Sequence, residues 1–301
     1  MAMCVTPLHK DFVGEVSGVD LRYPLDDASL SEISEALDRY AVLVFRNQRL
    51  TDEQQIAFSR HFGPLETAIG TLRKGRKHRL HSSALADVSN LDANNNIRPT
   101  SDRWRMFMLA NQLWHTDSSF KRVPGKISFL AAHEVPPSGG ETEFADLRAA
   151  YDALDAATKD RIEGLVAEHS IFHSRSLIGY TEFSDEERAA LPPVPQTVVR
   201  IHPGSGRKTL YLASHASHII GWPVEQGRAL LDELIEFATR PCFVHQHRWQ
   251  AGDLVVWDNR CTLHRGRPYD DAKFRRDMRR TTVEDSAPTV QQPRLARAAT
   301  A

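Results

Sequence analysis

The sequence is poor in cysteine, has almost no excess charge of either sign and contains no long hydrophobic run. Its 301 residues include three cysteines, Cys4, Cys242 and Cys261, and this odd, widely spaced set argues against a disulfide framework or a cysteine-rich zinc site. The 38 Lys and Arg residues nearly balance the 39 Asp and Glu residues, so no chain-wide positive field exists to attract nucleic acid or an anionic membrane. No apolar run approaches the ~20 residues that a membrane span requires. We therefore expect neither nucleic acid nor membrane as a partner.

Two further absences concern targeting and nucleotide binding. The first ten residues have no basic segment followed by an apolar stretch, so we expect a cytoplasmic protein. No Gly-rich phosphate-binding loop is present, which disfavours a nucleotide-binding doubly wound sheet. A composition with 41% hydrophobic and 26% charged residues is typical of a chain that folds around its own core, and the length allows one large domain or two.

Hydrophobic periodicity predicts many short strands with helices inserted between them. Capping signatures at residues 29–32 and 51–54 predict two helix starts, a helical pattern covers residues 147–166, and Pro223 opens one more helix. The predicted strands cover residues 41–45, 127–132, 141–144, 197–201, 209–212, 243–248, 254–257 and 277–283. This order favours a mainly β fold, a sandwich or barrel of the jelly-roll type with inserted helices.

Residues 64–105 and the C-terminal segment lack this periodicity. Gly, Asn, Ser and basic residues dominate residues 64–105, and a long irregular stretch inside a compact chain is typical of a functional lid. A solvated loop is the alternative, which we favour for the basic run at residues 73–78. Residues 285–301 are rich in Pro, Gln, Ala and Arg and are predicted to form a peripheral tail. We expect one domain over residues 1–284, with its lid near residues 64–105.

Pairs of His and Asp separated by one residue are candidates for metal binding. Two such pairs occur among 14 histidines and 22 aspartates, where composition alone predicts about one. His9 and Asp11 lie in a polar N-terminal segment, which favours chance. His115 and Asp117 follow an apolar stretch instead, and in a strand residues i and i+2 lie on the same face, where both side chains can reach one ion.

A third ligand is predicted much later in the chain. His264 follows an apolar strand and a polar turn within residues 252–265. Together with His115 and Asp117 it would complete a two-His-one-carboxylate face, an arrangement typical of non-heme Fe(II) oxygenases because it leaves coordination positions open. The alternative for each histidine is a hydrogen-bonded residue of the core.

Two arginines near the C-terminal strand are candidates for anion binding. Period-2 alternation places Arg276, Met278 and Arg280 on one face of the strand. If this face points inward, both guanidinium groups need counter-ions, and the planar fork of Arg suits a carboxylate. Their Cα atoms would lie roughly 13 Å apart, enough for two separate small molecules. The alternatives are pairing with protein Asp or Glu, or an exposed cationic strand edge.

These residues resemble a known family. The His115-Thr-Asp117 motif, His264, Thr142 in Ser-Gly-Gly-Glu-Thr, and the arginines of Arg-Arg-Asp-Met-Arg-Arg resemble the Fe(II)/2-oxoglutarate-dependent dioxygenases of the taurine dioxygenase type. The likeness is strongest to the 2,4-dichlorophenoxyacetate dioxygenase branch and extends over residues 7–282. It implies a double-stranded β-helix, or jelly roll, and usually a homo-oligomer.

The resemblance also implies residue roles, cofactors and a reaction. The implied iron ligands are His115, Asp117 and His264, the implied 2-oxoglutarate ligands are Thr142 and Arg276, and the implied substrate ligands are Arg280 and His215. With O2 and 2-oxoglutarate, such an enzyme hydroxylates the carbon next to the ether oxygen of an aryloxyacetate, a small anionic aromatic substrate. The products are a phenol, glyoxylate, succinate and CO2.

Two alternatives to this reaction stay open. The same machinery can act on another small anion, such as a sulfonate or a phenylalkanoate. Residues 92–105 match no pattern of the family, and the basic residues of 70–81 have an ambiguous register; both segments fall where a lid would cover the aryl group. A jelly roll that binds anions without catalysis is the second alternative. The intact set of three metal ligands argues against it.

Overall fold

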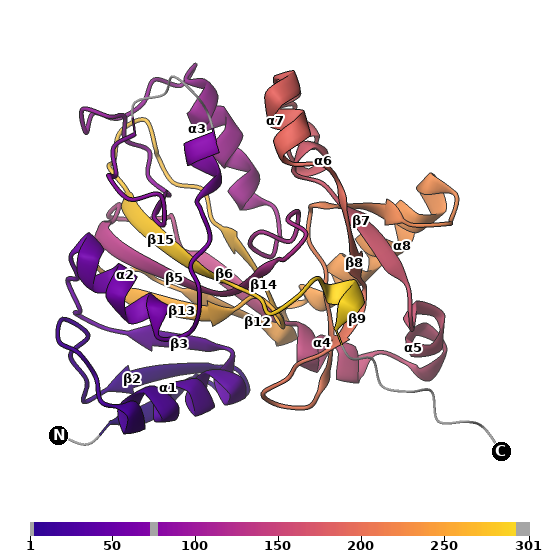
Figure 1. The fold of residues 1–301 in the computed structure, drawn as a ribbon, viewed down its shortest axis with the longest axis horizontal. Coiled ribbons are helices and arrows are strands. Elements are labelled where there is room, and N and C mark those ends of the chain that lie inside the picture. Colours follow the sequence, from indigo (N-terminus) through magenta and orange to yellow (C-terminus); the bar gives the residue numbers. More distant parts are fainter. Residues whose placement is uncertain (1–2, 73–77, 293–301) are drawn as a thin grey trace.

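A seven-stranded sheet forms one side of the molecule in the computed structural model, which describes residues 3–72 and 78–292 (Figure 1). Its strands lie in the order β1 (Cys4–His9), β2 (Val13–Ser17), β3 (Val42–Phe45), β13 (Leu254–Asp258), β5 (Gly125–Glu134), β15 (Asp277–Glu284) and β4 (Ala86–Asp87). Neighbouring strands are antiparallel except β2 and β3, which run parallel. Strands distant in the sequence are therefore neighbours in this sheet.

A smaller antiparallel sheet packs against this one. It consists of β12 (Val244–His247), β6 (Thr142–Asp146) and β14 (Thr262–Gly266). Phe144 of β6 is fully buried and packs in one cluster with Leu130, Val255, Trp257 and Met278 of the large sheet. Apolar side chains from two facing sheets thus form a common core, as in a sandwich. The predicted mainly β fold is confirmed, and its core is a double-stranded β-helix.

Helices cover the outer side of the large sheet near the N-terminus (Figure 1). Helices α1 (Asp27–Tyr40) and α2 (Asp52–Arg60) bury Ile33, Leu37 and Phe58 against Phe45 and Phe129. Both have amphipathic sequences whose apolar residues recur at helical spacing, which is why they lie along the sheet. These helices serve packing.

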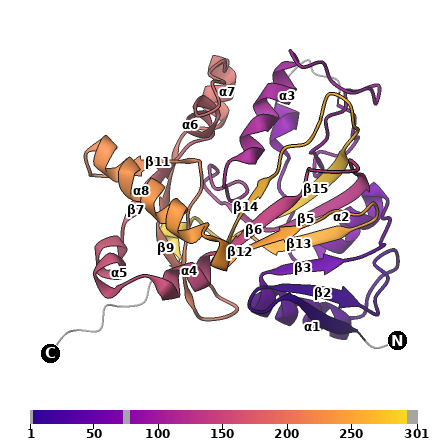
Figure 2. The ribbon, with the colours of Figure 1, turned by 180° about the vertical axis from the view of Figure 1, so that it is seen from behind.

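The part of the chain between β6 and β12 forms a second body of structure (Figure 2). It contains two small sheets. One consists of β11 (Ala216–Ile219), β7 (Val166–His169) and β8 (Val194–Thr197), and the other of β10 (Lys208–Leu210) and β9 (Val199–Ile201). Its helices are α4 (Leu147–Ala153), α5 (Ala156–Ile162), α6 (Ile171–Ser176), α7 (Asp185–Ala190) and α8 (Val224–Ala238). Helix α8 packs along β11 and shares an apolar core with α4 and α5.

Short helices complete the described chain. The α-helix α3 (Arg103–Met108) lies in the predicted lid, and 3-10 turns are found at η1 (Ile69–Leu72), η2 (Leu109–Gln112), η3 (Pro241–Phe243) and η4 (Thr289–Gln291). In Figure 1, α3 and α6 both lie at the top of the molecule, with α3 on the left and α6 further to the right. None of the helices in the described part of the chain is long and apolar enough to cross a membrane.

Two predicted helix boundaries are wrong. Asp26, not Ser29, caps α1, because its carboxylate accepts the backbone N–H of Ser29 at 2.8 Å. The pattern over residues 147–166 forms two short helices and the start of β7, because Asp155 ends the first stretch and caps α5 by accepting the N–H of Thr158. Asp binds free helical N–H groups in extended conformations, and this local preference interrupts the longer apolar period.

The predicted peripheral tail is also wrong for residues 285–292. Asp285 pairs with buried Arg200 at 2.7 Å, and Thr289, 2% exposed, donates a hydrogen bond to Gln196 at 2.6 Å. These partners lie about 90 positions earlier, so local composition carries no sign of them. Residues 293–301 of the predicted tail lie outside the described residues.

The capping box of α2 generates a stability prediction. Thr51 accepts the N–H of Gln54 at 3.3 Å, and the Gln54 side chain accepts the N–H of Thr51 at 2.9 Å. Thr51→Ala removes one of these bonds, and we expect a loss of about 1 kcal/mol in the free energy of unfolding, measured by urea denaturation. Thr51→Ser keeps the hydroxyl and should retain most of that stability; an equal loss in both variants would contradict the capping role.

Candidate active site

Three side chains suited to metal binding converge between the two sheets. His115, Asp117 and His264 each offer a ligand atom, and these three atoms lie within 4.8 Å of one another. All three residues are buried. The structure therefore brings together the predicted ligand set, although 147 positions of the chain separate Asp117 from His264.

A backbone bridge explains this convergence. The N–H of His115 donates to the carbonyl of His264, and the N–H of His264 donates to the carbonyl of His115, both at 2.9 Å. His264 belongs to β14, whereas His115 forms only this isolated bridge. The strand predicted through residues 115–117 is wrong, because Asp117 lies in a turn where its N–H donates to the Asn259 side chain instead.

The two imidazoles are prepared as neutral ligands. His115 Nδ1 lies 2.7 Å from the carbonyl of Leu113, which can only accept, so Nδ1 carries the proton and Nε2 offers its lone pair. Burial lowers the pKa of both His115 and His264. The Nε2 atoms lie 3.9 Å and 3.6 Å from the carboxylate oxygens of Asp117. Neutral imidazoles beside a carboxylate are suited to holding a divalent cation.

A hydrogen-bond relay orients the carboxylate of Asp117. Ser128 Oγ donates to Asp117 Oδ2 at 2.7 Å, and Asn259 Nδ2 donates to Ser128 Oγ at 2.9 Å. Asn259 Oδ1 accepts from the indole N–H of Trp257 and from the backbone of Asp117. Burial opposes ionisation of Asp117, but the charge of Arg280, the two neighbouring imidazoles and the hydrogen bond from Ser128 together outweigh it and leave the pKa below its usual value. Asp117 is therefore an oriented anion, and the donor set fits Fe(II).

Arg276 and Thr142 lie together on one side of the three ligands. Both line a cavity that also reaches His115 and His264. Arg276 Nη1 donates to the carbonyl of Val88 at 3.3 Å, while its buried Nε has no partner within residues 3–72 and 78–292. No carboxylate of the described residues pairs with Arg276. Pairing with protein Asp or Glu is thus absent here, and a bound carboxylate would satisfy this guanidinium.

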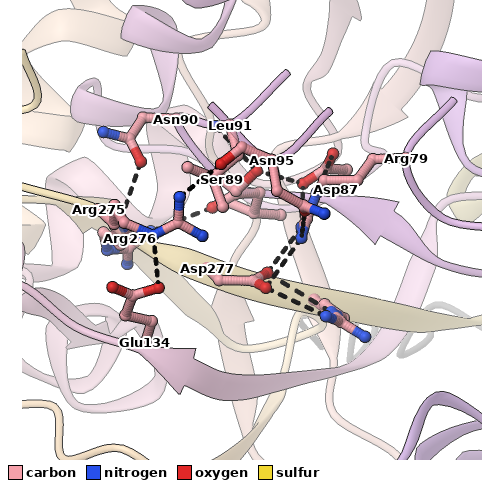
Figure 3. A network of polar contacts seen from close by, with 12 residues as sticks. Arg79, Asp87, Ser89, Asn90, Leu91, Asn95, Glu134, Arg275, Arg276 and Asp277 are labelled. Atoms are coloured by element: carbon pink, nitrogen blue, oxygen red, sulfur yellow. Dashed lines mark hydrogen bonds and ion pairs between the residues drawn. The ribbon is translucent and has the colours of Figure 1, made fainter. Parts of the chain in front are cut away.

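Asn90 fixes the backbone that carries Arg276 (Figure 3). Its Oδ1 accepts the N–H of Arg276 at 2.9 Å, and its Nδ2 donates to the carbonyls of Asp271 and Phe274. All of the hydrogen-bonding atoms of this buried amide are thus engaged with the segment before β15. Residues of the predicted lid therefore position the cavity that contains Arg276.

Ion pairs fix the position of Asp277, the residue that follows Arg276 (Figure 3). Arg79, which is almost fully buried, lies between Asp87 and Asp277 and makes two hydrogen bonds to each carboxylate. Asp277 also accepts from Arg279, which pairs with Asp52 at 2.7 Å. Burial works against ionisation of Asp277, but the bonds from Arg79 and Arg279 dominate and lower its pKa to about 2.

Arg280 projects toward a second cavity. Met278 is fully buried in the core, Arg279 points to the opposite face, and Arg280 lines both cavities beside His115, so the predicted alternation along this strand is confirmed. Arg280 Nη1 donates to Asp117 Oδ1, and its buried Nε lacks a partner among the residues described. The apolar and aromatic residues that line the second cavity include Ile69, Leu85, Trp104, Phe107, Phe120 and Ile171.

His215 lies in this second cavity. It is 2% exposed, its ring packs edge-on against Phe120 with centroids 4.8 Å apart, and its Nδ1 lies 2.8 Å from Ser174 Oγ. Burial holds the pKa of His215 well below its usual range, and the charge of Arg175 acts in the same direction. The structure thus places every predicted site residue around the same centre.

Several contributing residues were not predicted as site residues. Asn259 belongs to a stretch that supported the family resemblance, but the sequence assigned it no role. Asn90 lies in the irregular segment, where no periodic signal exists. Ser128 and Ser174 carry no local mark of function, because their roles come from partners far away in the chain. Residues 73–77 of the basic run lie outside the described part.

Comparison with known proteins agrees with this geometry. A jelly roll with two His and one carboxylate between its sheets defines the class of non-heme iron oxygenases. Residues 5–282 match the family described as taurine catabolism dioxygenase TauD, TfdA family. The chain belongs to this family of dioxygenases, as the resemblance implied.

Relatives and solved structures cover nearly the whole chain. It is 48% identical, over 95% of its length and 99% of the relative, to the α-ketoglutarate-dependent 2,4-dichlorophenoxyacetate dioxygenase of Cupriavidus pinatubonensis. It is 41% identical to the (S)-phenoxypropionate/α-ketoglutarate dioxygenase of Sphingobium herbicidovorans, over 89% of the chain and 91% of the relative. The crystal structure of AAD-2 in complex with Mn(II) and N-oxalylglycine superposes with a TM-score of 0.88 at 50% identity, covering 97% of this chain and all of that one.

The relay to Asp117 generates a metal-binding prediction. Ser128→Ala removes the hydrogen bond to Oδ2, and we expect 10- to 100-fold weaker Fe(II) binding, whereas Asp117→Ala should abolish binding. Affinity is measured by anaerobic Fe(II) titration with 2-oxoglutarate present, following the metal-to-ligand charge-transfer band. Ser34→Ala, an exposed serine of α1, is the control. Unchanged affinity in Ser128→Ala would show that the relay does not support the metal.

The ion pairs around Asp277 generate a pH prediction. Because the folded pKa of about 2 lies below the unfolded value of about 4, this carboxylate stabilises the fold above pH 4 and loses the effect as pH falls from 4 to 2. Asp277→Asn should lower the free energy of unfolding by about 1 to 2 kcal/mol at pH 6, with a difference that shrinks below pH 4. Thermal melts from pH 6 to 2.5 measure it.

The matched control for this experiment is Glu134→Gln. Glu134 pairs with Arg275 at 2.8 Å, but both side chains are exposed, so its loss should change stability little at any pH. If Asp277→Asn and wild type differ by the same amount across the whole pH range, the carboxylate does not act through its charge.

Proposed function

We propose that this protein is an Fe(II)- and 2-oxoglutarate-dependent dioxygenase that hydroxylates the carbon next to the ether oxygen of aryloxyacetates such as 2,4-dichlorophenoxyacetate. The observation that carries the proposal is the pair of guanidinium groups, Arg276 and Arg280, on two sides of one His-Asp-His centre. Arg276 lines the first cavity, and Arg280 lines the first and the second, so the site has room for two anions. The named activities of the relatives support this choice of substrate.

Each set of residues has a separate role in this proposal. His115, Asp117 and His264 hold the iron, and Thr142 and Arg276 hold the far carboxylate of 2-oxoglutarate. When bound, iron and 2-oxoglutarate together supply the oxidation of the substrate by O2, with release of succinate and CO2. The protein contributes the orientation of both molecules.

The substrate cavity determines which carbon reacts. Arg280 pairs with the substrate carboxylate, and the aromatic residues Trp104, Phe107 and Phe120 surround the aryl ring. The methylene group between carboxylate and ether oxygen then lies beside the iron ligands. Its hydroxylation gives a hemiacetal, whose O–H proton passes to the leaving aryl oxygen as the carbon–oxygen bond breaks. The products are a phenol and glyoxylate.

Another small anion stays open as the substrate. A cavity with a guanidinium group and aromatic walls also accommodates an aryl sulfonate or a phenylalkanoate, and the same reaction would apply. Succinate formation across a panel of these anions and of phenoxyacetate separates the alternatives. A binding protein without catalysis would form no succinate when Fe(II) is added.

Three further features belong to the same proposal. We infer a lid near residues 64–105, because residues within 68–70, 78–88 and 104–108 line the substrate cavity. The single catalytic domain over residues 1–284 stays a prediction. Cytoplasmic location stays a prediction. Assembly as a homo-oligomer rests on the family resemblance, and sedimentation analysis tests it.

The two arginines generate opposite kinetic predictions. Arg280→Ala should raise KM for the aryloxyacetate about 10- to 100-fold, because a charge-assisted pair is lost, with little change in KM for 2-oxoglutarate. Arg276→Ala should do the reverse. Steady-state succinate assays with each substrate varied in turn measure both constants. Equal loss of affinity for both molecules in either variant would show that the roles are misassigned.

A further inference from the structure

The hydroxyl of Thr142 makes a hydrogen bond whose direction is fixed. Trp249 Nε1 lies 3.0 Å from Thr142 Oγ. An indole N–H can only donate, so the Thr142 oxygen is the acceptor of this bond. In the described part of the chain Trp249 is the only hydrogen-bond partner of this hydroxyl, so the Thr142 proton has no acceptor there. Because Thr142 is buried, a bound acceptor must take this proton.

Arg276 adds a second donor at the same place. Its Nε is buried and lacks a partner among the described residues. This atom lies 3.5 Å from the position that a Cβ would occupy at Gly140, two residues before Thr142. Both side chains line the first cavity. Two unused donors at one end of a cavity suit a carboxylate, whose oxygens accept hydrogen bonds and whose charge pairs with the guanidinium.

Strand register places the indole beside Thr142. His247 of β12 pairs with Thr142 of β6 in the small sheet, so Trp249, two residues after His247, lies near the same point of β6. The rings of His247 and Trp249 pack edge to face, with centroids 4.6 Å apart and planes at 83°. Asp253 holds His247 in turn, because its Oδ2 lies 3.2 Å from His247 Nε2. The indole therefore reaches Thr142 from a fixed direction.

We propose that Trp249 is a positioning residue for 2-oxoglutarate, because its N–H occupies the Thr142 oxygen and directs the Thr142 proton to the far carboxylate. The inference rests on the roles of Thr142 and Arg276 in the proposed function. Within the described chain Trp249 does not line the first cavity, so it acts through Thr142. A hydroxyl without this bond can turn its proton away from the ligand, and the affinity gained from a preorganised donor is lost.

The effect is confined to one of the two reactants. Among the described residues, Thr142 lines the first cavity and not the second, whereas Arg280 lines both. Loss of the indole N–H should therefore weaken the binding of 2-oxoglutarate, while kcat and the KM for the aryloxyacetate stay nearly unchanged.

The test is a double-mutant cycle with Trp249→Phe and Thr142→Val in the full-length protein. Phenylalanine keeps an aromatic ring beside His247 but removes the N–H. Anaerobic titration of the Fe(II)-loaded protein with 2-oxoglutarate, followed by the charge-transfer band, measures the dissociation constant without turnover. We expect Trp249→Phe to raise this constant about 5-fold and Thr142→Val about 10-fold, because a hydrogen bond to a charged group is weakened or lost. In the Thr142→Val background, Trp249→Phe should add a change of less than about 2-fold.

Trp222→Phe is the matched control. Trp222 packs against the core around α8 and lies outside both cavities, so its variant should bind 2-oxoglutarate as wild type does. Thermal melts of all variants monitor folding. Steady-state succinate assays give the KM for phenoxyacetate, which should stay within about 2-fold of the wild-type value in Trp249→Phe.

The outcomes separate this inference from the proposed function. An unchanged dissociation constant in Trp249→Phe, or an equal increase in the wild-type and Thr142→Val backgrounds, would overturn the positioning role while the dioxygenase assignment stands. A parallel rise for 2-oxoglutarate and phenoxyacetate would also refute it, since the change would then affect the whole site. A normal band without turnover of any aryloxyacetate would remove the proposed substrate alone. A wild-type protein that gives no band with Fe(II) and 2-oxoglutarate would overturn both proposals.

Discussion

The site depends on two backbone hydrogen bonds that join residue 115 to residue 264. The bonds are reciprocal, so they fix the separation and the relative direction of two chain segments in one step. Both imidazoles then point to the same side with their rings 4.2 Å apart. Without this bridge, the position of the loop residue His115 relative to the strand residue His264 would not be fixed.

Charge is distributed around this centre in a way that leaves room for ligands. The protein holds one ionised carboxylate, Asp117, between two neutral imidazoles, and places two guanidinium groups beside them. Arg280 forms an ion pair with Asp117, whereas Arg276 has no carboxylate partner in the described residues. Elsewhere, buried arginines such as Arg148 and Arg79 are paired with aspartates. The guanidinium of Arg276 therefore fits the proposed role of binding a carboxylate, because a cation with a buried, unpartnered donor is costly.

Sequence reasoning reached those parts of the site that carry local signals. The one-residue spacing of His115 and Asp117 and the alternation around Met278 are short-range patterns, and both led to residues that the structure brings together. The strand assigned to residues 115–117 was wrong. The predicted convergence of the ligands was still right, because a single backbone bridge places His115 beside His264. Asn90 and Ser174 could not be found, since their partners lie 181 to 186 and 41 positions away.

Asn90 has a consequence for attempts to redesign this enzyme. Residues within 79–105 line the second cavity, so this segment is the natural one to exchange when the ligand of that cavity is to be changed. In this chain the same segment carries the amide that clamps the backbone of Arg276. Replacing residues 79–105 as a block would therefore disturb the cavity that contains Arg276 together with the second cavity. Libraries should hold positions 79, 87 and 90 constant and vary the residues between and beyond them.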